Sequence, residues 1–182
     1  MPLLAMLLLL CRAAVFTAVM DECPCNPASE ESMRERRCSL CGVAEEQPPE
    51  AAYFFLKDAS SMKPNRLLLL PRSHDYDGRL PLSKMPLKAR LELWHAAIKH
   101  AQELWGDDWG VAVNGDEVRT QCHSHFHIGK LLKGVEYGKP LTVKGPEQFP
   151  VPMDGTGFWV HKHGNRMHVH TGEQRAETVL LR

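Results

Sequence analysis

The sequence lacks an excess of charge of either sign, because its 22 lysines and arginines are matched by 22 aspartates and glutamates. Nucleic-acid and polyanion binders normally carry a concentrated basic excess, so this balance argues against both classes. Internal repeats and low-complexity tracts are also lacking. At 182 residues we expect a single domain with enough chain to bury a core. The residue present in abundance is histidine: seven of the ten lie between positions 123 and 170.

Residues 2–20 are almost entirely apolar, yet no Lys or Arg precedes this run and no clean Ala-x-Ala cleavage site follows it. A membrane span needs about 20 apolar residues, and Arg12 would lie near its middle. We expect residues 1–20 to be a signal peptide or membrane anchor, 21–37 a linker, and 38–182 a folded domain that ends in a hairpin. The protein is then exported to the periplasm or anchored to the membrane. If the leader instead reflects a mis-assigned start codon, the protein is cytoplasmic.

The pattern of apolar residues predicts strands and one long helix. Residues 51–57 and 66–70 are typical of two strands joined by a turn, and residues 109–114 and 121–132 are typical of two more. Between these pairs, apolar side chains repeat every three or four positions over residues 86–105, which predicts an amphipathic helix. Residues 138–157 are expected to form a surface connection, and residues 157–181 a hairpin. The order predicts an α+β domain with an antiparallel sheet.

The six cysteines leave two interpretations open. Cys38 and Cys41 form a C-x-x-C pair, which is found in both metal sites and disulfides. Cys23 and Cys25 are too close in sequence to bridge each other easily, so each pairs elsewhere or stays reduced. The redox state of Cys122 is equally open from the sequence.

Three histidines, His123, His125 and His127, occupy alternate positions. On a strand such side chains face the same way at intervals of about 6.6–6.8 Å. One interpretation is an exposed histidine-rich strand, and the other is a catalytic row. His95 and His100, on the predicted helix, are expected to be structural or solvated.

The segment H-x-H-x-H-I at residues 123–128, together with RLLLLPRSH at residues 66–74 and the helix between them, resembles the histidine triad superfamily of nucleotide hydrolases and transferases. The resemblance covers about residues 38–132. It implies an antiparallel sheet with one long helix, and it implies that His125 attacks the α-phosphorus to form a covalent nucleotidyl-histidine. Small members of the superfamily often pair through the long helix, so a homodimer is among the implied partners.

The chemistry of the neighbouring residues is consistent with that role. A neutral imidazole is nucleophilic near pH 7, and a covalent intermediate divides one difficult displacement into two. His127 is expected to bind phosphate oxygens or to orient His125. Asn114, Thr120 and Gln121 are uncharged donors suited to the phosphate oxygens. Arg119 is expected to neutralise the developing charge. We expect no catalytic metal to be required.

One branch of this superfamily, which includes galactose-1-phosphate uridylyltransferase, carries a structural zinc. Its ligands are a C-x-x-C pair, the histidine after the "Pro-basic" strand end, and the first histidine of the triad. The resemblance therefore implies a zinc bound by Cys38, Cys41, His74 and His123, with all four ligands supplied by the protein and no open position for water. The alternatives for Cys38 and Cys41 are a disulfide, because an exported location favours oxidation of the thiols, and an inert pair.

A narrower resemblance concerns the substrate. The segment R-T-Q-x-x-x-H-x-H-I at residues 119–128 is similar to bacterial CDP-diacylglycerol pyrophosphatases, which release CMP and phosphatidate. This chain departs from that family because it is shorter, retains the first triad histidine and keeps the zinc ligands. CDP-diacylglycerol is the leading expected substrate. The alternatives are a histidine triad hydrolase or nucleotidyltransferase acting on soluble nucleotides, and a metal-binding module.

Four further histidines, His161, His163, His168 and His170, belong to the predicted C-terminal hairpin. A four-residue turn would place His163 opposite His168, whereas a two-residue Gly-Asn turn would place it opposite Arg166. The cluster is either a transition-metal site, a cationic wall of the phosphate pocket, or an inert hairpin.

Overall fold

The computed structural model describes residues 25, 29, 38–135 and 138–182. The predicted leader and most of the predicted linker lie outside these residues. Within the described part of the chain, no helix has both the length and the apolar character to cross a membrane.

Seven antiparallel strands form one sheet in the order β1-β2-β4-β3-β6-β7-β5. The strands and helices follow the chain as α2 (Ser39–Glu45), β1 (Tyr53–Lys57), β2 (Leu67–Pro71), α3 (Pro81–Lys84), α4 (Leu87–Trp105), β3 (Trp109–Val113), β4 (Phe126–Lys130), β5 (Leu141–Val143), η1 (Pro146–Gln148), β6 (Gly157–His163), β7 (Arg166–Glu173) and η2 (Ala176–Val179). The predicted α+β class is confirmed.

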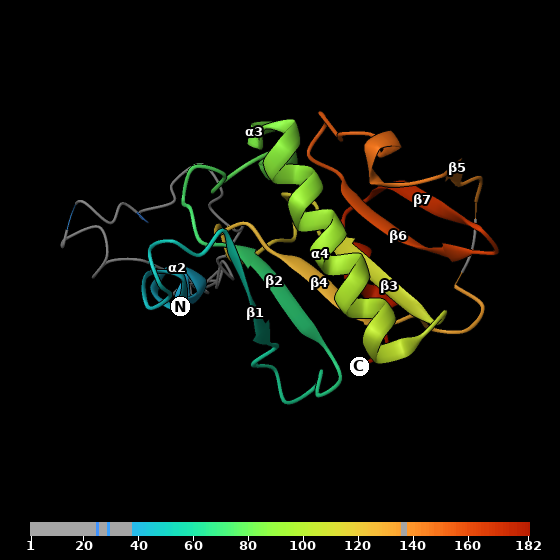
Figure 1. Cartoon of the computed structure of the whole chain (residues 1–182), viewed down its shortest axis with the longest axis horizontal. Coiled ribbons are helices and arrows are strands. Elements are labelled where there is room, and N and C mark those ends of the chain that lie inside the picture. The colour runs from blue at the N-terminus through green and yellow to red at the C-terminus, as the bar shows by residue number, and fades with distance from the viewer. Residues whose placement is uncertain (1–24, 26–28, 30–37, 136–137) are drawn as a thin grey trace, which may run out of the picture.

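The long helix α4 lies across one face of the sheet (Figure 1). It begins after Pro86, whose fixed φ suits a helix start, and ends at Gly106, which has a positive φ of 57°. Its buried Trp94 packs edge-on against Phe126 of β4, with ring centroids 4.8 Å apart. These contacts belong to the main hydrophobic core between α4 and the sheet.

The opposite face of the sheet is covered in part by the chain's last turn. Ala112 of β3 and Trp159 of β6 pack there against Val179 and Leu180. Because side chains alternate along a strand, His127 also points to this face, since its neighbours Phe126 and Ile128 belong to the core under α4. His127 therefore lies on the face away from α4.

Two predicted elements differ from the structure. The strand expected over residues 121–132 begins only at Phe126, because the segment before it bonds to side chains instead of to a neighbouring strand: the His123 amide donates to Cys38 Sγ and the Ser124 amide to Asp77 Oδ1. The expected surface connection contains a short edge strand, β5, which pairs with β7.

Candidate active site and cysteine cluster

A cavity of about 410 Å³ opens on the sheet face away from α4. The loop between β1 and β2, the segment after β3, and η2 form its walls. All six residues that the sequence analysis assigned to catalysis or substrate binding line this cavity: Asn114, Arg119, Thr120, Gln121, His125 and His127. The fold thus brings together residues that lie up to 13 positions apart in the chain.

The ring of His125 has a defined tautomer. Its Nδ1 lies 2.7 Å from the carbonyl oxygen of His123, and a carbonyl can only accept, so the proton is on Nδ1. Nε2 then carries the lone pair. Burial, followed by the proximity of His127, lowers the pKa of His125 to about 3, so the ring is neutral near pH 7. A neutral imidazole with a fixed tautomer is suited to nucleophilic attack.

His127 lies next to His125, with ring centroids 5.0 Å apart. Its Nε2 is 3.3 Å from Asn114 Nδ2, and its Nδ1 is 3.4 Å from Glu177 Oε2. The second distance is within ion-pair range but long for a hydrogen bond. Burial lowers the pKa of His127 to about 4, so this ring too is neutral at pH 7.

Arg119 is buried, and its Nη2 donates to Asp116 Oδ1 at 2.7 Å and to the carbonyl oxygen of Gly78. Its Nε and Nη1 have no hydrogen-bond partner among the described residues. A buried guanidinium with unused donors is costly unless an anion or a polar ligand approaches. Gln121 is fixed differently, because its Oε1 accepts from Ser39 Oγ and the Leu40 amide.

Four cavity residues with charged side chains were not anticipated from the sequence: Asp58, Lys63, Arg175 and Glu177. Glu177 accepts from Lys63 Nζ and from Arg66 Nη1, each at 2.6 Å. The one signal in the sequence is that Glu177 is the only acidic residue after Glu173. Asp58, His127 and Glu177 could together hold a metal ion, but Lys63 already neutralises the two carboxylates, at 3.9 and 2.6 Å.

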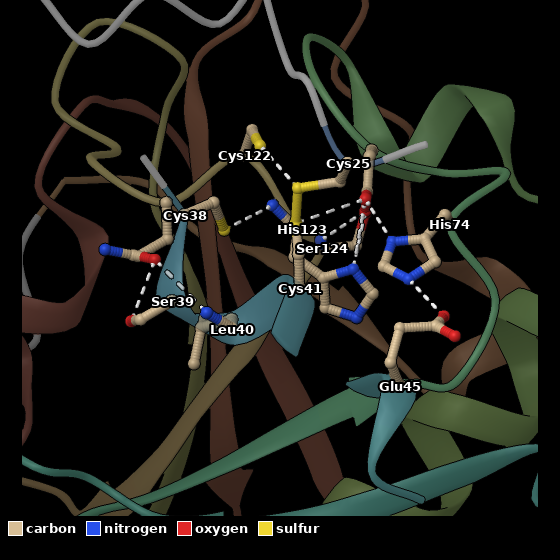
Figure 2. Close-up of a disulfide and its surroundings, with 12 residues drawn as sticks. Cys25, Cys38, Ser39, Leu40, Cys41, Glu45, His74, Cys122, His123 and Ser124 are labelled. Carbon is tan, nitrogen blue, oxygen red and sulfur yellow. Dashed lines mark hydrogen bonds and ion pairs between the residues drawn. A yellow bond between two sulfur atoms is a disulfide. The ribbon is translucent and has the colours of Figure 1, made fainter. Parts of the chain in front are cut away.

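A second site lies beside the cavity, where Cys25, Cys38, Cys41 and Cys122 converge (Figure 2). All four are buried, and their sulfur atoms lie within 4.8 Å of one another. Cys25 and Cys41 form a disulfide in the structure, while Cys38 is a free thiol whose pKa is raised by burial. A buried set of four cysteines could hold a metal ion.

The predicted zinc ligands are only partly assembled. Cys38 and Cys41 lie in the four-cysteine cluster, and His74 lies in a second candidate group with Cys25, Cys41 and Asp77. Both His74 ring nitrogens contact carboxylates at 2.8 Å, Asp77 at Nδ1 and Glu45 at Nε2. In the described part of the chain His123 is in neither group.

The ring of His123 makes two other contacts. Its Nδ1 is 2.8 Å from Asp77 Oδ1, and its Nε2 is 2.9 Å from the Pro71 carbonyl oxygen. Cys25 and Cys122 therefore complete the cluster around Cys38 and Cys41 in this structure.

The hairpin histidines form a stack on one face of β6 and β7. The turn is the two-residue one, so His163 lies opposite Arg166 and His161 opposite His168. The rings of His163 and His168 nevertheless stack with centroids 3.7 Å apart, and His170 stacks on Trp159 at 3.6 Å. None of the four lines the cavity, and none belongs to a candidate metal group among the described residues.

The two buried histidines make the fold sensitive to acid. Both have pKa values below the 6.5 of an exposed imidazole, so the unfolded chain takes up protons first as the pH falls through about 6.5. We expect the free energy of unfolding to decrease by roughly 1–3 kcal/mol for each pH unit between about 6 and 4. Urea denaturation at each pH measures this slope.

A double variant, His125→Asn with His127→Asn, is the matched comparison. It should reduce the slope, whereas His95→Asn, at an exposed helix position, should leave it unchanged. Equal stability of the wild type at pH 7 and pH 5 would contradict the assignment of two neutral buried imidazoles.

Comparison of the chain with protein-family models and with curated proteins gave no match.

Proposed function

We propose that this protein is a histidine triad type hydrolase that cleaves a nucleotide-linked phosphoanhydride through a covalent nucleotidyl-histidine on His125. The observation that carries the proposal is the hydrogen bond from His125 Nδ1 to the His123 carbonyl, which directs the lone pair to Nε2. The same ring lines a cavity whose volume, about 410 Å³, lies within the range of small-ligand sites.

In the first step, the lone pair of His125 Nε2 attacks the α-phosphorus and forms a nitrogen–phosphorus bond. The bond from that phosphorus to the bridging oxygen breaks, and the second phosphate leaves with its electron pair. Water then attacks the same phosphorus, the nitrogen–phosphorus bond breaks, and the electron pair returns to Nε2. Arg119 and the amides of Asn114 and Gln121 are the proposed donors to the phosphate oxygens.

CDP-diacylglycerol is the proposed substrate, with phosphatidate as the leaving group and CMP as the product. The cavity has an apolar wall that includes Leu40, Leu56 and Leu68 beside its polar residues, which suits the base and sugar of a nucleotide. Its volume is suited to the nucleotide head alone, so the acyl chains would stay outside, at a membrane surface. A soluble nucleotide anhydride is the alternative that the same cavity favours.

We also propose that the four-cysteine cluster binds zinc with a structural role. In the structure Cys38 is a free thiol, whereas Cys25, Cys41 and Cys122 are disulfide-bonded, so zinc binding requires their reduction. The four thiolates then form a complete tetrahedral set that leaves no position for water. The buried Arg119 supports this assignment, because its positive charge interacts with Cys38 and offsets the negative charge of a metal–thiolate centre. This ligand set replaces the two-cysteine, two-histidine set that the family resemblance implied.

The test of the proposed function is capture of the intermediate. The full-length protein is mixed with CDP-diacylglycerol in detergent, or with a dinucleoside polyphosphate, and is quenched in alkali before its intact mass is measured. We expect an added mass of one nucleoside monophosphate, located on the peptide that contains His125. Product formation without an adduct on that peptide, or no turnover of any nucleotide anhydride, would contradict the proposal. His95→Ala serves as a control variant that keeps both adduct and turnover.

A further inference from the structure

Glu177 belongs to η2, 50 residues after His127 in the sequence, yet its carboxylate lies 3.4 Å from the His127 ring in the cavity. Its carboxylate is anchored from the other side by Lys63 Nζ and Arg66 Nη1. Burial alone would raise the pKa of Glu177, but the charges of His127 and Lys63 lower it to about 2. The group facing His127 is thus a carboxylate, not a carboxylic acid.

The backbone of the same residue determines the orientation of Asn114. The Glu177 amide donates to Asn114 Oδ1 at 3.0 Å, so the Asn114 side-chain nitrogen must lie on the other side. That nitrogen is 3.3 Å from His127 Nε2 and can only donate. His127 Nε2 is therefore the acceptor, and the ring proton is on Nδ1, which has no hydrogen-bond partner among the described residues and lies 3.4 Å from Glu177 Oε2.

We propose that Glu177 is a positioning residue that holds His127 with its proton on Nδ1, so that Nε2 accepts a proton from the water that releases the nucleotide. This inference rests on the proposed function. In that second step the Asn114 amide donates to a phosphate oxygen instead of to His127 Nε2, which leaves the Nε2 lone pair available. The water oxygen then bonds to phosphorus, one water proton passes to His127 Nε2, and the electron pair of the broken nitrogen–phosphorus bond returns to His125. The carboxylate then stabilises the imidazolium, as a buried acid does for a general-base histidine in other hydrolases.

Several other charged groups surround His127 and contribute to its protonation. His125 lies beside it on the same segment, and the remaining groups come from the β1–β2 loop and the start of β2: Asp58, Lys63 and Arg66. The two cations disfavour the imidazolium, whereas the two acids favour it. Glu177 is the acid whose carboxylate lies within ion-pair distance of the His127 ring, at 3.4 Å, so the test removes its charge.

The test is Glu177→Gln in the full-length protein, with three measurements. We expect kcat to fall by about tenfold to a hundredfold with little change in KM, because proton transfer is impaired while binding is not. The acid limb of the pH–rate profile should move to lower pH, since loss of the carboxylate lowers the pKa of His127. Nitrogen-15 NMR should show the Nδ1–H tautomer of His127 in the wild type and a mixture in the variant.

Glu147→Gln is the matched control, because Glu147 also contacts a histidine, His95 at 3.1 Å, but lies outside the cavity. Glu177→Asp should restore part of the rate. A variant that loses thermal stability and kcat but keeps the tautomer and the pH profile would overturn the inference, because η2 would then act only as a structural support.

The NMR measurement on the wild type does not depend on turnover or on the variant folding. An Nε2–H tautomer of His127 overturns the inference by itself. If no nucleotide is hydrolysed but the Nδ1–H tautomer is found and depends on Glu177, the positioning is supported and the proposed function is what fails.

Discussion

His125→Ala is expected to reduce kcat/KM by about 10⁴-fold or more, because removal of a nucleophile eliminates the covalent path and leaves only binding and electrostatic stabilisation. Initial rates of CMP release from CDP-diacylglycerol measure the loss. The variant should fold, because His125 lines the cavity and precedes β4, so the substitution leaves the pairing of that strand unchanged. His127→Ala, which affects proton transfer but not the nucleophile, is expected to lose less activity.

Chemical rescue distinguishes loss of the nucleophile from loss of structure. His125→Gly leaves a space beside a cavity of about 410 Å³, into which free imidazole can enter. Added imidazole should restore part of the rate, with saturation at high concentration. A His125→Ala protein that cleaves as fast as the wild type would exclude the covalent mechanism, whatever the substrate.

Metal removal is expected to have the largest effect on stability. Binding of zinc by cysteine-rich sites contributes about 10–16 kcal/mol to folding in small zinc domains, more than most single domains possess in total. Under reducing conditions we therefore expect one metal ion per chain by mass spectrometry, and a large fall in Tm when a chelator is added. Cys38→Ser should show the same loss of metal and of Tm.

If the Cys25–Cys41 disulfide is kept and no zinc is bound, the response of Tm to reductant and chelator is expected to differ. The disulfide closes a loop of 16 residues, worth about 3 kcal/mol, so reductant alone would lower Tm moderately and a chelator would have no effect. No bound metal together with this response would contradict the zinc assignment. Ser61→Ala is the control variant, because Ser61 is exposed and is not one of the four cluster residues.

The local elements were predictable because their signals are local. The spacing of apolar residues located α4 to within one residue, and the Gly164-Asn165 pair was one of two turns considered for the hairpin. The start of β4 was not predictable, because His123 bonds to Cys38, 85 positions earlier. The pattern of apolar residues does not show where a distant side chain accepts a backbone hydrogen bond in place of a neighbouring strand.

The candidate site likewise combines residues that were predictable from local sequence with residues that were not. The six predicted cavity residues lie within 14 positions of one another, where the sequence pattern and the family resemblance both apply. Glu177 and Cys25 join the two sites from distant parts of the chain. Ligand sets and orienting charges that depend on topology are therefore the part that sequence reasoning could not supply.

The two backbone bonds of His123 have a consequence for the order of folding. Its amide donates to Cys38 Sγ and its carbonyl accepts from His125, so the proposed nucleophile is oriented through a contact that spans 85 positions. The Arg66–Glu177 pair spans 111. Contacts of such long sequence separation form slowly compared with a helix or a hairpin. We expect α4 and the β6–β7 hairpin to form early, and catalytic competence to be acquired among the last events of folding.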